Sequence, residues 1–239
     1  MMRAALQHLS LGWRRALFAG LVVGLLAFVL SSNAAHSALL RGLSAVERVA
    51  ASHPGWAAAL VVLFAALAAM LAFLSSWIVV PFAVYTWGPI GALLLLWIGW
   101  LLGGTASYTI GRVFGRPVVE WLGFGPLLAR YEERVSSRTP FAFAFLFQLA
   151  VPSEVPGYLF GLGRYPYLRY LTSLGLAELP YGFATVYLGA GIVQRRATMV
   201  LIIGSALMLL TGWAWFALHR RLAREEWIPK ERRAARVKV

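Results

Sequence analysis

Residues 141–163 read FAFAFLFQLAVPSEVPGYLFGLG, which is too apolar for a surface loop and too interrupted for an ordinary membrane helix. Pro152 and Pro156 lack a backbone N–H and disrupt helical hydrogen bonding near the middle of this stretch, and Gly157 and Gly161 permit a turn there. In hydrocarbon, such a backbone is tolerated only where protein covers it or where it lines a water-filled cavity. The stretch therefore predicts a re-entrant hairpin beside a transport site.

Glu154 lies between the two prolines, at the apex of the expected hairpin. An ionisable group inside the membrane is a functional candidate, because its charged form is disfavoured there unless an arginine pairs with it. The alternative is a carboxylate that only caps the free N–H groups of the half-helix that follows. We predict that Glu154 contacts the transported substrate.

The composition of the whole chain agrees with a membrane location. Its 239 residues are 60% hydrophobic, with a mean hydropathy of +0.72. The net charge of +13 comes almost entirely from arginine, which in this setting orients the protein and holds anionic lipid headgroups rather than nucleic acid. The absence of cysteine excludes disulfides, thiolate nucleophiles and cysteine-ligated metals.

The hydropathy pattern predicts an all-α polytopic integral membrane protein with about five membrane helices and two re-entrant hairpins in an inverted repeat. The expected spans are residues 16–30, 56–74, 89–110, 165–191 and 199–218. The first is short, so it is a marginal membrane helix or a signal anchor. The chain divides into an N-terminal helix and amphipathic connector (1–54), a membrane transport domain (55–193), a C-terminal membrane helix (194–218) and a basic tail (219–239).

A second interrupted segment, residues 75–88, contains Pro81 and ends in a Trp-Gly-Pro turn. Paired interrupted segments in corresponding halves are typical of transporters with an inverted repeat and a site between the halves. Chance similarity between apolar segments is the rival interpretation. Small residues at Gly99, Gly103, Ser107, Gly111 and Gly115 follow every fourth position and predict close approach by a neighbouring helix.

The distribution of basic residues tests the hairpin independently. If residues 141–163 enter and leave on one face, fifteen Lys and Arg residues between 112 and 238 share that side, against Arg195 and Arg196 on the other. A full crossing would remove this bias. The positive-inside rule therefore favours a re-entrant hairpin and a cytoplasmic C-terminus. The same counting leaves the side of the N-terminus open.

Three features resemble the DedA/VTT superfamily, also called the SNARE-associated or yeast Tvp-like family: GGTASYTIGRVFGR at 103–116, the hairpin at 152–156, and Leu188-Gly189. The likeness covers roughly residues 55–193. It implies two hairpins that face each other from opposite leaflets. It also implies movement of lipids between leaflets, either phospholipid scrambling or recycling of polyprenyl-phosphate carriers. Many relatives carry an arginine before the first proline of the second hairpin, where the nearest residue here is Gln148, and several carry an acidic residue near the first hairpin, where residues 75–88 have none.

Other candidate site residues are polar groups near the expected membrane segments. Glu178 precedes a proline and is expected to pair with an arginine or with N–H groups at the kink. Arg112 and Arg116 share a helix face and either bind a lipid phosphate or extend to the interface as topology markers. Gln148 suits a headgroup contact or a hairpin brace. The predicted substrate-binding residues are Gln148, Glu154, Glu178, Arg112, Arg116 and Arg164.

Sequence motifs do not favour an enzyme. No HExxH or GxSxG motif occurs and aspartate is absent, so we expect no catalytic residues, no metal and no cofactor. The predicted function is lipid translocation between leaflets, with a link to proton movement. The predicted location is a bacterial inner membrane, and the predicted partners are anionic lipids. A proton- or ion-coupled small-molecule transporter and a non-transport membrane assembly factor are the alternatives. The oligomeric state is left open.

Overall fold

The computed structural model describes residues 33–71, 74–121, 135–151 and 154–226. These residues form helices and contain no strand. The elements are α2 (Asn33–Ser52), α3 (Pro54–Met70), the 3-10 turn η1 (Ser76–Ile78), α4 (Val80–Phe114), α5 (Arg116–Val119), α7 (Phe141–Ala150), α8 (Glu154–Leu162), α9 (Tyr167–Val193) and α10 (Ala197–Glu226). The predicted all-α class is confirmed.

Three of the described helices, α4, α9 and α10, are long and apolar enough to cross a membrane. With 17 residues, α3 is shorter than these spans and more apolar than any of them. α4, α9 and α10 correspond to three of the five expected spans, α3 overlaps a fourth, and the fifth, at 16–30, lies outside the described residues. The chain is thus an all-helical integral membrane protein.

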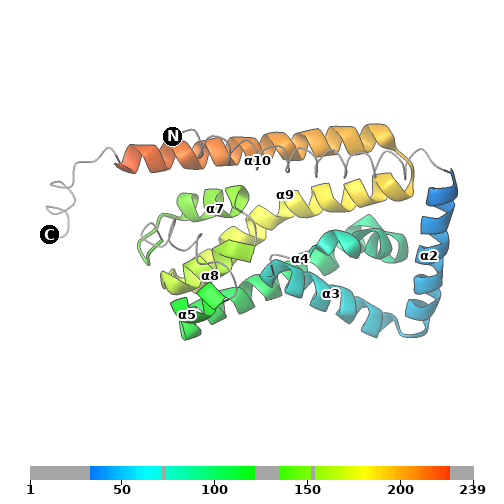
Figure 1. Cartoon of the computed structure of the whole chain (residues 1–239), viewed down its shortest axis with the longest axis horizontal. Coiled ribbons are helices and arrows are strands. Elements are labelled where there is room, and N and C mark those ends of the chain that lie inside the picture. The colour runs from blue at the N-terminus through cyan, green and yellow to red at the C-terminus, as the bar shows by residue number, and fades with distance from the viewer. Residues whose placement is uncertain (1–32, 72–73, 122–134, 152–153, 227–239) are drawn as a thin grey trace, which may run out of the picture.

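The central helix is α4, which contacts α3, α8 and α9. In turn α9 contacts α7 and α10, and α10 lies along one side of the molecule (Figure 1). Much of α10 faces outward with large apolar side chains, as a helix against lipid does. At one end of the bundle, α2 crosses the other helices, and its Asn33 accepts a 2.6 Å hydrogen bond from Arg195 in the turn between α9 and α10.

Glycine at position 88 separates α4 into two helical pieces. Gly88 has φ 69° and ψ 175°, a combination that a side chain at this position would strain, and Pro89 begins the longer piece. The expected Trp-Gly-Pro turn is therefore present. The short piece, residues 80–87, forms the return arm of the first broken segment after α3 and η1.

The chain breaks lie at slightly different positions from those expected. The first falls between α3 and α4, and Pro81 lies in the first turn of α4, where its missing N–H costs no helical hydrogen bond. The second separates α7 from α8, and Pro156 lies in the first turn of α8 instead of breaking the helix a second time. Pro152 lies outside the described residues.

The role expected for Gly157 and Gly161 was wrong in its detail. Both residues lie inside α8 and are buried, so they do not turn the chain. They allow contact with α4: a Cβ at Gly157 would lie 2.6 Å from Ser107 Cβ, and one at Gly161 would lie 2.2 Å from the Tyr108 carbonyl oxygen. Glycine is needed here because two backbones touch.

The small-residue stripe is confirmed as a packing surface from Gly99 to Gly111, whereas Gly115 ends α4 and packs against no other helix. A Cβ at Gly103 would lie 2.2 Å from the Ala66 carbonyl oxygen of α3, and one at Gly111 would lie 2.3 Å from the Tyr158 carbonyl oxygen of α8. One helix thus fits closely against both broken segments.

Candidate functional site

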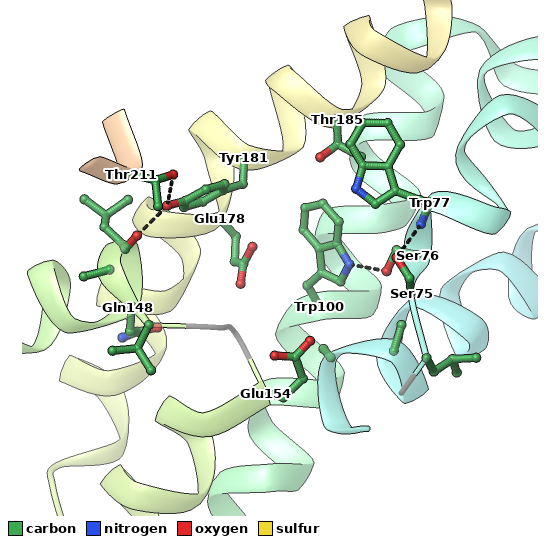
Figure 2. A pocket seen from close by; sticks show the side chains of 16 residues that line it. Ser75, Ser76, Trp77, Trp100, Gln148, Glu154, Glu178, Tyr181, Thr185 and Thr211 are labelled. Atoms are coloured by element: carbon green, nitrogen blue, oxygen red, sulfur yellow. Dashed lines mark hydrogen bonds between the residues drawn. The ribbon is translucent and has the colours of Figure 1, made fainter. Parts of the chain in front are cut away.

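A cavity of about 510 Å³ lies between the two chain breaks (Figure 2). Its walls come from the end of α3, from η1, and from α4, α7, α8, α9 and α10. The lining residues are Ala68, Ala69, Leu74, Ser75, Ser76, Trp77, Trp100, Gln148, Leu149, Ala150, Val151, Glu154, Glu178, Tyr181, Thr185 and Thr211. Segments far apart in sequence therefore share one polar space inside an apolar protein.

The cavity lies near mid-height of the membrane-length helices. Trp100 is close to the middle of the long piece of α4, Glu178 is close to the middle of α9, and Thr211 lies in the central part of α10. A bilayer that surrounds these helices would place the cavity near its centre. Polar groups at that depth are costly unless they serve a passage.

A tyrosine hydroxyl satisfies a free carbonyl at the end of each broken helix. Tyr158 of α8 donates to the Met70 carbonyl oxygen at 3.1 Å, at the end of α3. Tyr181 of α9 donates to the Leu149 carbonyl oxygen in the last turn of α7. The last four carbonyls of a helix have no partner in their own helix, and in a membrane an unpaired carbonyl is costly. These bonds help the chain to break inside the bilayer.

Two carboxylates from different helices face the cavity. Glu154 begins α8 and Glu178 lies on α9, and Figure 2 shows both side chains pointing into the space between the breaks. Glu178 is 8% exposed. The structure brings these two predicted site residues together. The position of Glu154 in the first turn of α8 also agrees with the alternative of a capping carboxylate.

The third predicted residue in the cavity is Gln148, which is 6% exposed. Its Nε2 group donates to Ser173 Oγ and, at 3.5 Å, to the Tyr170 carbonyl oxygen. These bonds orient the amide and support the expected brace. The Oε1 atom has no hydrogen-bond partner. A buried acceptor is left available at the cavity wall.

Hydroxyl and indole groups form the other side of the cavity in Figure 2. Ser75 accepts a hydrogen bond from the Trp77 backbone N–H at 3.4 Å, which starts the turn η1. Ser76 accepts one from Trp100 Nε1 at 3.0 Å. Trp77 on the rim is 43% exposed, so the cavity is open there. This side is polar without a formal charge.

The predicted arginines lie elsewhere. Arg112 is exposed near the end of α4, where its Nη1 donates to the Tyr108 hydroxyl at 2.7 Å. Arg116 forms a 2.6 Å ion pair with Glu120 at the surface, and Arg164 is exposed in the turn after α8. None of the three lines the cavity. The ion pair expected between Glu178 and one of them is not formed, because the end of the bundle and its middle are too far apart.

Several lining residues were not predicted as site residues. Trp100 is buried, and its indole N–H is bonded to Ser76. Tyr181 and Thr185 follow Glu178 by three and seven positions, so the helical repeat alone places all three on one face of α9. That spacing was the available signal. The cavity face of η1 had no comparable pattern.

The described parts of the chain contain no group of three or more His, Asp or Glu side chains that could hold a metal ion. The cavity offers carboxylate, amide, hydroxyl and indole groups. Such groups can bind and release a polar headgroup or a proton, and they surround a space large enough for a small polar molecule.

Comparison with known proteins supports this architecture. The profile of the VTT domain matches residues 48–191, a range that includes both chain breaks and every cavity residue except Thr211. Searches of curated proteins and of solved structures find no significant match. The matched range covers more than half of the chain. The protein therefore belongs to the VTT domain family, which is the DedA or SNARE-associated family that its sequence resembles.

Proposed function

We propose that this protein moves lipids between the two leaflets, with the headgroup passing through the cavity while the acyl chains stay in the bilayer. The observation that carries the proposal is the polar cavity between two chain breaks at mid-height of the membrane helices. Interrupted segments of this kind commonly build transport sites. The phospholipid and polyprenyl-phosphate classes both have a polar headgroup that a mid-membrane cavity would shelter.

Family membership supports a transport-related role over catalysis. The cavity holds carboxylates at the positions of Glu154 and Glu178, and either group could exchange a proton during the cycle. A proton link is therefore part of the proposal.

The proposed location is a bacterial inner membrane with the C-terminus in the cytoplasm. Figure 1 shows α5 and the end of α10 at one end of the bundle, and α2 with the α9–α10 turn at the other. In or beside the elements of the α5 end are Arg112, Arg116, Arg138, Arg164, Arg169 and Arg220. The sequence that follows α10 contains Lys230, Arg232, Arg233, Arg236 and Lys238. In or beside the elements of the opposite end are Arg41, Arg48, Arg195 and Arg196. This bias favours a cytoplasmic α5 end, where the arginines would contact anionic headgroups.

The carboxylate pair favours one second candidate, a proton- or ion-coupled transporter of small molecules. Two acids in a cavity at mid-membrane are typical of sites that bind a coupling cation. Such a protein would carry a water-soluble substrate and would leave lipids in their leaflets.

A leaflet-access assay tests the proposal. Purified protein in liposomes is mixed with fluorescent phospholipid and polyprenyl-phosphate analogues, and an impermeant quencher reports the fraction that reaches the outer leaflet. We expect movement above that of protein-free liposomes. Glu154→Gln should lower the initial rate about tenfold or more, since hydrogen bonds to charged groups are worth roughly 1.5–3 kcal/mol.

The controls separate the candidates. Glu47→Gln, on α2 and outside the cavity lining, should keep the wild-type rate and report correct folding. No movement of any lipid by folded protein would favour the small-molecule transporter. Lipid movement that is unchanged in Glu154→Gln would remove Glu154 from the mechanism. A cellular phenotype that persists in that variant without lipid movement would favour a membrane assembly factor.

A further inference from the structure

Hydrogen-bond acceptors from three helices, α7, α8 and α9, line the cavity. Gln148 uses its amide N–H groups on Ser173 and Tyr170, so its unpaired Oε1 atom is what remains for a ligand. Glu154 and Glu178 add carboxylates from two other helices. More than nine-tenths of Gln148 and of Glu178 is buried, so bulk water does not supply all the hydrogen bonds that these acceptors can take.

The cavity lining also lacks positive charge. The sixteen residues that form it include no Arg, Lys or His. The nearest predicted anion binders, Arg112 and Arg164, lie exposed at the end of the bundle. An anion would find no cationic partner in the wall, and either carboxylate in its ionised form would repel it.

We propose that the cavity selects a primary ammonium group, which donates hydrogen bonds to Gln148, Glu154 and Glu178. An ammonium carries one positive charge and three N–H donors, which matches acceptors that three helices present to one cavity. A quaternary ammonium has the same charge but no donor, and would leave the acceptors unpaired. The site therefore distinguishes an ethanolamine headgroup from a choline headgroup.

The opposite side of the cavity suits the rest of such a headgroup. Ser75, Ser76 and Thr185 carry hydroxyl groups that can donate to a phosphate oxygen, and Figure 2 shows them across the cavity from Gln148. A zwitterionic phosphoethanolamine group would lie between the two walls with each charge near suitable partners. Its net charge of zero would also lower the cost of placing it at mid-membrane.

This inference rests on the proposed lipid translocation, and the source of the ammonium group is tested separately. Liposomes receive acyl-labelled phosphatidylethanolamine, phosphatidylcholine or phosphatidylglycerol in parallel, and the rate of leaflet exchange is measured for each. A separate arm follows entry of radiolabelled ethanolamine into the vesicles. We expect phosphatidylethanolamine to exchange about tenfold faster than phosphatidylcholine, and phosphatidylglycerol to be slowest.

Variants locate the selectivity. Glu178→Gln keeps the size of the side chain and removes its charge, and it should reduce the preference for ethanolamine over choline to near unity. Glu154→Gln should do the same, so the proposal stays testable if one variant fails to fold. Glu47→Gln is the matched control and should retain the preference.

The outcomes distinguish the two proposals. Equal rates for the three lipids would overturn the ammonium site and leave lipid translocation standing. Entry of ethanolamine without movement of any lipid would overturn lipid translocation and support an ammonium site that serves a free amine. A preference that persists in both glutamate variants would also overturn the assignment, and so would the absence of both lipid movement and amine entry.

Discussion

The hairpin of α7 and α8 is enclosed by protein, whereas the turn between α3 and α4 remains partly open at the rim of the cavity. Every residue from Val155 to Gly161 is buried, but Trp77 and Ile78 in η1 are 43% and 70% exposed. The enclosed hairpin carries Gln148 and Glu154, and the open turn carries only neutral hydroxyl and indole groups.

The difference follows from the cost of charge in a membrane. A carboxylate at mid-membrane needs a fixed surrounding that spares it from hydrocarbon, and α8 obtains this from its glycine contacts with α4. Hydroxyl groups cost less, so the first break tolerates a looser setting. We infer that the second hairpin sets the chemistry of the site and that the first forms its entrance.

The largest expected effect is on the close contact of α8 with α4. Gly161→Ala would place a Cβ 2.2 Å from the Tyr108 carbonyl oxygen, and the overpacking should destabilise the protein by about 1–3 kcal/mol. Thermal unfolding in detergent measures this. Gly42→Ala in α2, where a Cβ meets nothing within 4 Å, is the control and should be neutral or stabilising. Equal stability of both variants would show that α8 is not held by this contact.

The tyrosine caps at the two breaks are expected to have the next largest effect. Tyr158→Phe removes the hydroxyl bonded to the Met70 carbonyl and should cost about 1 kcal/mol. Tyr181→Phe does the same at Leu149, at the other break. The unfolding midpoints of the two variants show how much each hydroxyl stabilises its chain break. If neither variant lowered the unfolding midpoint, water would be replacing both hydroxyls.

A smaller effect is expected at the open wall. Ser76→Ala removes the hydroxyl that accepts from Trp100 and should slow leaflet exchange about threefold, since a neutral hydrogen bond is worth roughly 0.5–1.5 kcal/mol. The leaflet-access assay measures the exchange rate of this variant beside that of Glu154→Gln. If Ser76→Ala slowed exchange as much as the glutamate variant, the contrast between the two walls would be wrong.

The smallest effect is expected at the surface. Arg116→Gln breaks the exposed ion pair with Glu120 and should change stability by about 0–1 kcal/mol. If Arg116 serves only as a topology marker, leaflet exchange stays at the wild-type rate. A strong loss of exchange in folded protein would instead support its predicted contact with lipid.

The helical class, three of the expected spans, the interruption before Glu154 and the glycine stripe were all predictable, because each depends on local composition or spacing. The details of the chain breaks were not predictable. The interior position of Gly157 and Gly161 in α8 depends on a neighbouring backbone that no local pattern reveals. Of the six predicted site residues, the structure gathers Gln148, Glu154 and Glu178 in the cavity and leaves the arginines at the end of the bundle.

The sequence by itself determined that this chain lies in a membrane and that its helices break beside Glu154, since hydropathy, proline and glycine act within a few residues. Only the tertiary structure decided which polar groups meet. Gln148 and Glu178 are thirty residues apart, and they share a cavity because α9 packs against both α4 and α7. Such contacts depend on how whole helix surfaces fit together, and spacing along the chain does not encode that fit.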